Sequence, residues 1–306
     1  MQLYVAITDQ DWFDFLKAQA PDEVNFWRPS GRAFRTLQPG ELFLFKPHRL
    51  NYIMGGGFFS YFTALPASFV WRTFDTKNGA PDETAMRASI ERYRNVEPER
   101  DDDYQVGCIL LQRPFFLSPS DWIPLPEWKK GLMQGLTYDI EQQPGRMLWE
   151  RAIEAASAQP VVRDLLPCDA PLSPRFGQPQ LIMPRLGQGS FRVIVTDCYQ
   201  RRCAITNSPV LCTLDAVHIR PYAKEGPHAP ENGLLLRQDL HTLFDRGYLT
   251  VSPEYRLEVS RRIREEFENG REYYALHGNQ IRLPQETDRR PATDYLSWHN
   301  ENVFRG

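Results

Sequence analysis

The sequence lacks the features of several special classes of protein. It contains no run of about 20 apolar residues, the length that a membrane-spanning helix needs. The N-terminal residues Met1–Thr8 have neither a basic flank nor a small-residue cleavage site, which predicts a first strand rather than a signal peptide. No internal repeat or low-complexity tract is present. We therefore expect an ordinary globular chain, without membrane contact, in the cytoplasm.

Cysteine pairs and a basic excess are missing too. The five cysteines are odd in number, which favours a reducing compartment over a disulfide scaffold. Their tightest spacing, Cys198 to Cys203, does not form the closely spaced pairs of a structural zinc site. The net charge is −3, so any contact with nucleic acid must come from a local basic face. We expect the acidic run 97–103 to be a solvated loop.

What is present divides the chain into three parts. Residues 1–150 alternate short apolar runs with a few helical patterns, which predicts a mixed α+β unit. Residues 151–184 contain a helix end and then a stretch in which proline recurs, so a long regular element is excluded there. Residues 185–306 form the second unit. The expected elements are strands at 3–7, 39–46, 52–54, 106–111, 203–206, 211–218, 248–251 and 256–259, and helices at 9–18 (capped by Thr8), 83–93, 146–158, 191–199, 237–245 and 261–269.

The segment from Asp215 to Asp245 has the most informative pattern. His218 ends a short apolar run, and Asn232 opens an Asn-Gly turn before three leucines. His241 and Asp245 are four residues apart in a predicted helix, so they share one face. One imidazole and one carboxylate on one face suit a divalent metal ion. With His218 left as a base, the arrangement suggests phosphodiester hydrolysis.

This segment resembles the HNH nucleases, also called the ββα-metal family, and more narrowly the HNH domains attached to bacterial restriction-type DNA readers. The resemblance runs from about Gln188 to Phe304 and includes the joint match of apolar context, Asn-Gly turn and H-x-x-x-D pair. It implies a ββα-metal domain whose two strands we expect at 203–206 and 211–218.

The resemblance assigns roles to individual residues. It implies that His218 is the general base, that Asn232 fixes the loop orienting it, and that His241 and Asp245 bind Mg²⁺ or Mn²⁺. Many members carry a metal ligand directly before the base, where this chain has Val217. Asp215 is the alternative ligand, although an orienting role toward His241 or an arginine fits it better. The candidate phosphate contacts are Arg192, Arg220 and Arg237.

The N-terminal part is similar to the PUA-like superfamily, which includes the EVE and SRA modules that read modified bases. The residues that carry this similarity include Phe26-Trp27-Arg28-Pro29, the run Leu37–Lys46, and Ile53–Phe59. It implies a bent β-barrel with helices and an aromatic pocket for an extruded base. The candidate pocket residues are Trp27, Phe58, Phe59, Trp71 and Tyr138.

Together, the two resemblances predict a type IV modification-dependent restriction endonuclease that acts on double-stranded DNA carrying a modified cytosine, such as 5-methyl- or 5-hydroxymethylcytosine. A double-strand break needs two cuts, which a homodimer would supply. Two alternatives stay open. One is a non-cleaving reader of modified nucleic acid, and the other is an HNH nuclease with an N-terminal RNA- or protein-interaction module.

Overall fold

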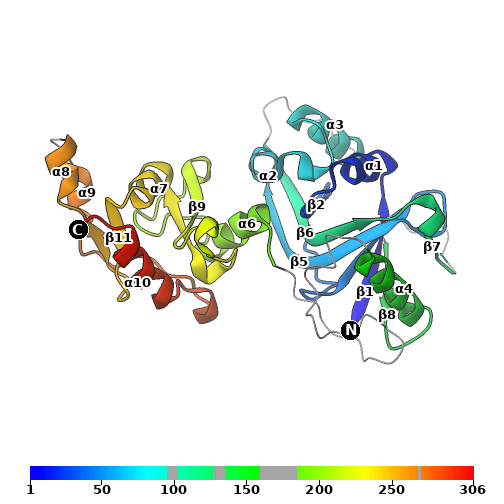
Figure 1. The fold of residues 1–306 in the computed structure, drawn as a ribbon. Coiled ribbons are helices and arrows are strands. Elements are labelled where there is room, and N and C mark those ends of the chain that lie inside the picture. Colours follow the sequence, from blue (N-terminus) through cyan, green and yellow to red (C-terminus); the bar gives the residue numbers. More distant parts are fainter. Residues whose placement is uncertain (95–102, 127, 129–134, 159–184, 268–269) are drawn as a thin grey trace. The chain divides into compact units, whose positions relative to one another are not determined.

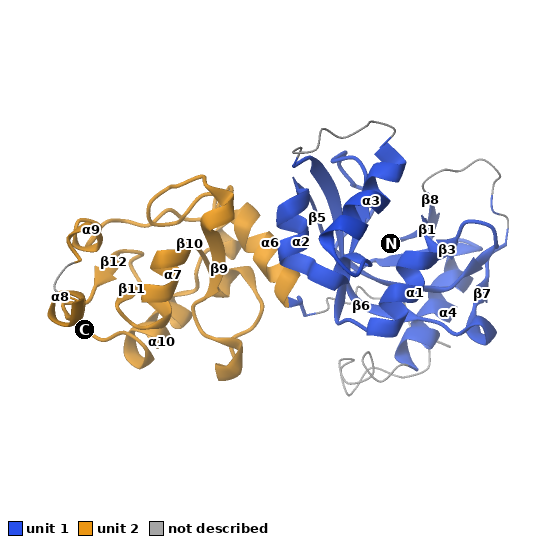
Figure 2. Ribbon diagram, turned by 90° about the horizontal axis from the view of Figure 1, so that it is seen from above, with its two compact units in different colours: residues 1–187 blue, residues 188–306 orange. Residues whose placement is uncertain are grey.

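The computed structural model describes residues 1–94, 103–126, 128, 135–158, 185–267 and 270–306. The chain falls into two compact units, residues 1–187 and 188–306 (Figure 2). Most of the acidic run, residues 97–102, and the proline-rich stretch 159–184 lie outside the described residues. In the part of the chain that the structure covers, no helix is long and apolar enough to cross a membrane.

Unit 1 is a mixed α+β unit around a six-stranded sheet with the order β2-β6-β5-β3-β1-β8 (Figure 1). β1 and β3 are parallel, and the other neighbouring strands in this sheet are antiparallel. β4 and β7 form a separate short ladder. The strands are β1 (Gln2–Thr8), β2 (Glu23–Arg28), β3 (Leu42–Pro47), β4 (Tyr52–Ile53), β5 (Gly55–Pro66), β6 (Gln105–Phe116), β7 (Ile123–Pro124) and β8 (Gly135–Asp139).

The expected bent barrel is not found among the strands that the structure describes. β2 and β8 stand at opposite ends of the strand order, and no ladder joins them. Register shifts between β5 and β6 disturb the sheet locally. Such irregularities bend a sheet, but closure needs a hydrogen-bonded ladder between its two edges. Unit 1 is therefore α+β with an open sheet in its described part.

The two faces of this sheet bury different apolar clusters. Along β3, Leu42 and Leu44 join one cluster, and Phe43 and Phe45 join the other, because successive side chains of a strand point to opposite faces. Helix α4 packs on the leucine side and α1 on the phenylalanine side (Figure 1). The helical elements of unit 1 are α1 (Gln10–Gln19), α2 (Ala67–Phe74), η1 (Asp75–Asn78), α3 (Glu83–Arg94), η2 (Pro119–Asp121) and α4 (Gly145–Ser157).

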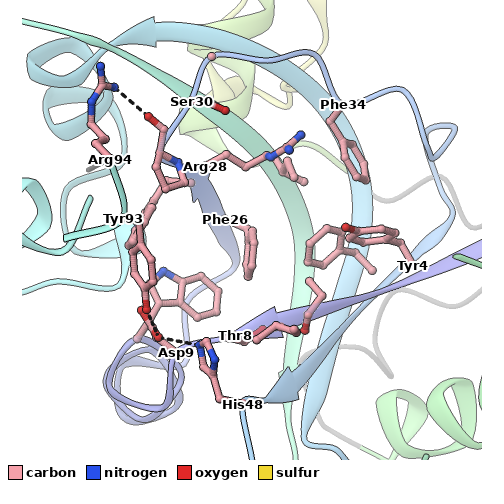
Figure 3. A pocket seen from close by; sticks show the side chains of 18 of the residues that line it. Tyr4, Thr8, Asp9, Phe26, Arg28, Ser30, Phe34, His48, Tyr93 and Arg94 are labelled. Atoms are coloured by element: carbon pink, nitrogen blue, oxygen red, sulfur yellow. Dashed lines mark hydrogen bonds and ion pairs between the residues drawn. The ribbon is translucent and has the colours of Figure 1, made fainter. Parts of the chain in front are cut away.

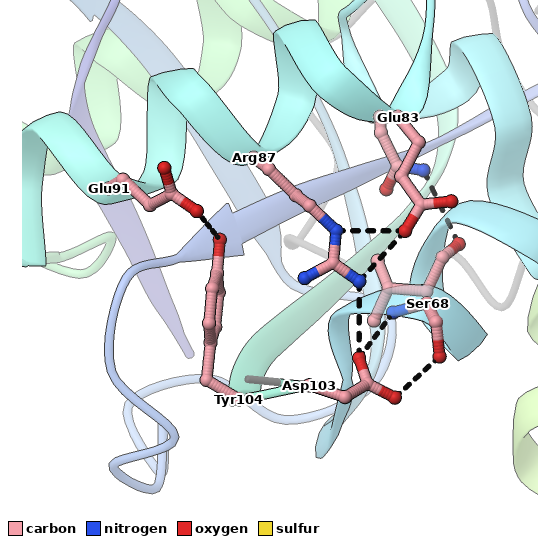
Figure 4. A network of polar contacts seen from close by, with 8 residues as sticks. Ser68, Glu83, Arg87, Glu91, Asp103 and Tyr104 are labelled. Carbon is pink, nitrogen blue, oxygen red and sulfur yellow. Dashed lines mark hydrogen bonds and ion pairs between the residues drawn. The ribbon is translucent and has the colours of Figure 1, made fainter. Parts of the chain in front are cut away.

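One local expectation for unit 1 needs correction. Thr8 does not cap α1, because its hydroxyl donates to the carbonyl of Ala6 and the cap position is occupied by Asp9. Asp103, the last residue of the acidic run, is held by protein groups. It accepts hydrogen bonds from the amide and hydroxyl of Ser68 and from Arg87, which also binds Glu83 (Figure 4). This network ties α3 to the start of α2.

Unit 2 contains a two-stranded antiparallel sheet, β9-β10, followed by helix α7. The helix at 188–198, the helix ending at Asp245 and the hairpin β11-β12 agree with the sequence predictions. The elements are α6 (Gln188–Cys198), η3 (Leu211–Thr213), β9 (Leu214–His218), η4 (Tyr222–Lys224), η5 (Pro230–Asn232), β10 (Gly233–Arg237), α7 (Gln238–Asp245), β11 (Leu249–Val251), β12 (Leu257–Val259), α8 (Arg262–Phe267), α9 (Arg271–Tyr274), η6 (Thr287–Arg289) and α10 (Thr293–Asn302).

The predicted first strand at 203–206 is wrong. The Cys203 amide donates to the carbonyl of Ser208, and the Asn207 amide donates to the carbonyl of Cys203, so the chain turns back on itself here. Asn207 has a φ of 58°, the left-handed region that asparagine tolerates in turns. The partner of β9 is instead β10, which contains the three leucines after Asn232.

Candidate active site

His218 is the last residue of β9 and lies opposite Gly233 of β10. Its ring stacks on Phe191 of α6, with centroids 3.9 Å apart and planes 12° apart. Gly233 has an extended φ of −127° and is already the first residue of β10, so the expected Asn-Gly turn is absent. Glycine is needed there for space, because an added Cβ would lie 2.5 Å from Val195 of α6. The close approach of β10 to α6 forms the frame in which His218 packs.

Asn232 holds the loop that joins His218 to β10. Its side chain is fully buried, accepts a hydrogen bond from the Arg220 amide at 2.9 Å and donates to the Arg220 carbonyl at 2.9 Å. The same amide donates to the carbonyl of Pro227 at 3.0 Å. At Gly226 an added Cβ would lie 1.8 Å from the Arg220 carbonyl oxygen. These contacts close the loop tightly just after His218.

His241 and Asp245 meet on one face of α7. The distance from His241 Nε2 to Asp245 Oδ2 is 3.1 Å, and His241 Nδ1 lies 3.7 Å from Asp215 Oδ2. The other Asp215 oxygen accepts a hydrogen bond from Arg192 at 2.7 Å. Asp215 thus lies between an arginine and the imidazole, which is the arrangement of an orienting residue. The carboxylates of Asp215 and Asp245 raise the pKa of His241 to about 9.

This pair fits a divalent ion. Two donors bound side by side on an octahedral ion, with bonds of about 2.1 Å, lie about 3 Å apart, close to the distance between His241 Nε2 and Asp245 Oδ2. The carboxylates that stabilise the proton on His241 would also attract a metal cation that replaces this proton. Within the described ranges, no group of three or more His, Cys, Asp or Glu side chains converges as a metal site. Val217, directly before His218, is buried in the apolar core.

His218 differs from His241 in its electrostatics. Burial, and in second place the neighbouring imidazole of His228, lower the pKa of His218 to about 4. A histidine with this pKa is neutral near pH 7 and keeps a lone pair that can accept a proton. Of these two histidines, His218 is therefore neutral near pH 7 and His241 is protonated, because their environments shift the two pKa values in opposite directions.

The three candidate phosphate contacts all have partners within the chain. Arg192 pairs with Asp215, and Arg237 forms two hydrogen bonds with Asp239. Arg220 donates to the carbonyl of Lys224 and lies over the ring of Trp298. In this conformation their guanidinium groups serve the fold of the unit.

Residues 203–252 match the family model of the HNH endonucleases. This part of the chain is an HNH endonuclease domain. A likeness in structure is found to the modification-dependent TagI restriction endonuclease, at 12% sequence identity and a TM-score of 0.29, covering 92% of this chain and 75% of the other. At this TM-score the likeness does not indicate a shared function. Among curated proteins, none matches the sequence.

A second candidate site, apart from the HNH domain, is a cavity of about 720 Å³ in unit 1. It opens on the phenylalanine side of the sheet and is lined by aromatic rings (Figure 3). At one end the Asp9 carboxylate accepts hydrogen bonds from the Tyr93 hydroxyl at 2.6 Å and from His48 Nε2 at 3.1 Å. The aromatic lining comprises Tyr4, Trp12, Phe26, Trp27, Phe34, Phe43 and Tyr93.

Of the five aromatic residues predicted for a base pocket, Trp27 lines this cavity. Its indole nitrogen donates to the carbonyl of Asn78 at 3.1 Å, which fixes the ring. Phe58 and Phe59 are buried in the core, and Tyr138 packs against the cluster on the leucine side of the sheet. Trp71 lies in α2 and is not among the lining residues.

Sequence reasoning missed Asp9, His48 and Tyr93, which come from separate segments and have no shared motif. It also assigned no role to His228. The structure places His228 Nδ1 2.8 Å from His218 Nε2. Only folding brings the members of each group together, so no spacing rule along the sequence could have found them.

Proposed function

We propose that this chain is a modification-dependent DNA endonuclease, in which the N-terminal unit is a PUA-like reader of a modified cytosine and the HNH domain cuts the DNA nearby. The nuclease part rests on the HNH family match and on the active-site geometry. A neutral His218, a loop closed by Asn232 and the His241–Asp245 pair lie within one small ββα frame. This convergence is the observation that carries the proposal.

In the proposed reaction, His218 takes a proton from the attacking water. Its stacking on Phe191 and its neutral state at pH 7 suit it to that task. Asn232 keeps the loop after His218 in one conformation. His241 and Asp245 would hold Mg²⁺ or Mn²⁺, which supplies Lewis-acid stabilisation of the phosphate when bound. Asp215, with Arg192 on its other oxygen, orients the His241 ring.

The cavity in unit 1 supports the reader part of the proposal. Its volume lies in the usual range of about 300–1,000 Å³ for small-molecule sites. Aromatic faces stack on an extruded base, and a carboxylate can accept a hydrogen bond from the N4 amino group of cytosine. Asp9 Oδ1 receives Tyr93 and His48, so we assign Oδ2 as the acceptor for that amino group. This carboxylate favours bases that carry an exocyclic amino group, and cytosine is one of them.

Digestion of three duplexes of identical sequence tests the proposal. They carry cytosine, 5-methylcytosine or 5-hydroxymethylcytosine, and each is incubated with Mg²⁺ or Mn²⁺. We expect cutting of a modified duplex by the wild-type protein and its loss in His218→Ala. His277→Ala is the matched control, because His277 is an exposed histidine outside the site. Equal cutting of all three duplexes would contradict the reader, and absence of cutting by a folded wild-type protein would contradict the nuclease.

A further inference from the structure

His228 contacts the proposed base directly. Its Nδ1 lies 2.8 Å from Nε2 of His218, and the two rings are inclined by 60° with centroids 4.9 Å apart. His228 belongs to the loop between β9 and β10, ten residues after His218. A short, tilted contact between ring nitrogens is a hydrogen bond in the ring planes rather than a stacking contact.

The loop holds His228 from two sides. The ring of Tyr222 stacks on it with centroids 4.6 Å apart and planes 7° apart. The carbonyl of Pro227, the preceding residue, accepts a hydrogen bond from the buried Asn232 side chain at 3.0 Å. His218 is stacked in turn on Phe191. The hydrogen bond therefore joins two imidazoles that are each packed against an aromatic ring.

This contact limits which tautomer of His218 can act as a base. A neutral imidazole has one N–H and one lone pair. If His218 donates through Nε2, the lone pair is on Nδ1 and can take a proton. If it accepts through Nε2, Nδ1 carries the hydrogen and no lone pair remains for water. The base therefore works only when His228 Nδ1 is the acceptor.

We infer that His228 is a positioning residue that fixes His218 in its Nε2–H tautomer. This inference rests on the proposed role of His218 as the base. In the reaction a water O–H bond breaks and an N–H bond forms at His218 Nδ1. The imidazolium so formed keeps donating through Nε2 to His228, and this hydrogen bond strengthens because the donor is now charged. The proton on Nδ1 later returns to solvent.

Two substitutions separate this role from packing. His228→Asn places an amide oxygen near the position of Nδ1, so it keeps the acceptor and loses the ring. His228→Phe keeps the ring against Tyr222 and loses the acceptor. In single-turnover cleavage of the modified duplex with Mn²⁺, we expect His228→Phe to lower the maximal rate about tenfold or more, with the half-saturating protein concentration nearly unchanged. His228→Asn should recover most of that loss.

A rate order in which His228→Phe exceeds His228→Asn, or wild-type rates in both, would overturn the inference. Nitrogen NMR of His218 supplies a readout that does not depend on cleavage. We expect the Nε2–H form in the wild-type protein and a mixture of tautomers in His228→Phe, and an Nδ1–H form in the wild type would overturn the inference. Full activity of His218→Ala would instead refute the proposed base, so the two failures are distinguishable.

Discussion

Asn232 and Arg220 exchange two hydrogen bonds, one in each direction. The Arg220 amide donates to Asn232 Oδ1 and Asn232 Nδ2 donates to the Arg220 carbonyl, both at 2.9 Å. An amide side chain suits this exchange, because its oxygen accepts while its neighbouring NH₂ group donates. The exchange fixes the backbone two residues after His218, and a third bond to Pro227 fixes it again before His228. One buried side chain thus controls the position of both histidines.

We therefore predict that Asn232→Ala both destabilises unit 2 and abolishes cleavage. The substitution leaves the partly buried amide and carbonyl of Arg220 without these partners, which costs about 1–3 kcal/mol in the free energy of unfolding. Urea unfolding followed by tryptophan fluorescence measures this change. Asn302→Ala is the control, since Asn302 makes one exposed hydrogen bond to Trp298 in α10. Equal stability of Asn232→Ala and wild type would contradict the role of Asn232.

If His241 and Asp245 bind the metal ion, the affinity for Mn²⁺ should depend on the carboxylate of Asp245 in α7. Asp245→Asn should weaken Mn²⁺ binding more than about tenfold, because it removes a charged donor. Asp239→Asn is the matched control, since Asp239 lies on the same helix but pairs with Arg237. Titration calorimetry of the DNA-free protein measures both affinities. An unchanged affinity in Asp245→Asn would place the metal elsewhere.

Metal binding should also release a proton. The pKa of His241 is raised to about 9, so this residue is protonated at pH 7.5 and must lose its proton to become a ligand. We expect close to one proton released per Mn²⁺ ion, detected as a dependence of the binding enthalpy on the buffer. The release should disappear in His241→Gln. A buffer-independent enthalpy in the wild-type protein would rule out His241 as a ligand.

The buried His299 predicts a loss of stability in mild acid. It stacks on Phe244 with centroids 3.7 Å apart, is 2% exposed, and burial lowers its pKa to about 4 from 6.5. The unfolded chain binds this proton more tightly, so its stabilising contribution is present above pH 6.5 and is lost as the pH falls toward 4. The slope reaches at most about 1.4 kcal/mol per pH unit. His299→Gln should have a shallower slope between pH 7 and 5 in urea unfolding, and an equal slope would contradict a buried neutral His299.

The sequence predicted the elements whose patterns are local. Helix α7 and the hairpin β11-β12 follow from amphipathic and alternating runs, and the i,i+4 spacing of His241 and Asp245 is enough to predict that they share one face. Cys203–Thr206 was misread because its residues favour strands, whereas the following Asn207-Ser208-Pro209 imposes turns. A segment with strand propensity does not form a strand when it has no strand to pair with and turn-forming residues follow it.

Contacts between distant segments could not be predicted. The bond between His218 and His228 depends on how the loop closes around Asn232, and the cavity of unit 1 assembles Asp9, His48 and Tyr93 from three segments. Phe58 and Phe59 are buried core residues, although the sequence alone made them candidates for the base pocket. Composition shows that aromatic residues are present, but only the alternation of the strands assigns each ring to a face.

The ratio of cleavage rates on modified and unmodified duplexes, compared between the wild-type protein and Asp9→Asn, tests the coupling of reader and nuclease most directly. Asp9 lines the cavity of unit 1 and belongs to no part of the HNH domain. We predict that the wild-type protein cuts the modified duplex roughly tenfold faster or more, and that Asp9→Asn brings the ratio close to one while the domain still cuts with Mn²⁺. A wild-type ratio of one, or a ratio that Asp9→Asn leaves unchanged, would contradict the account.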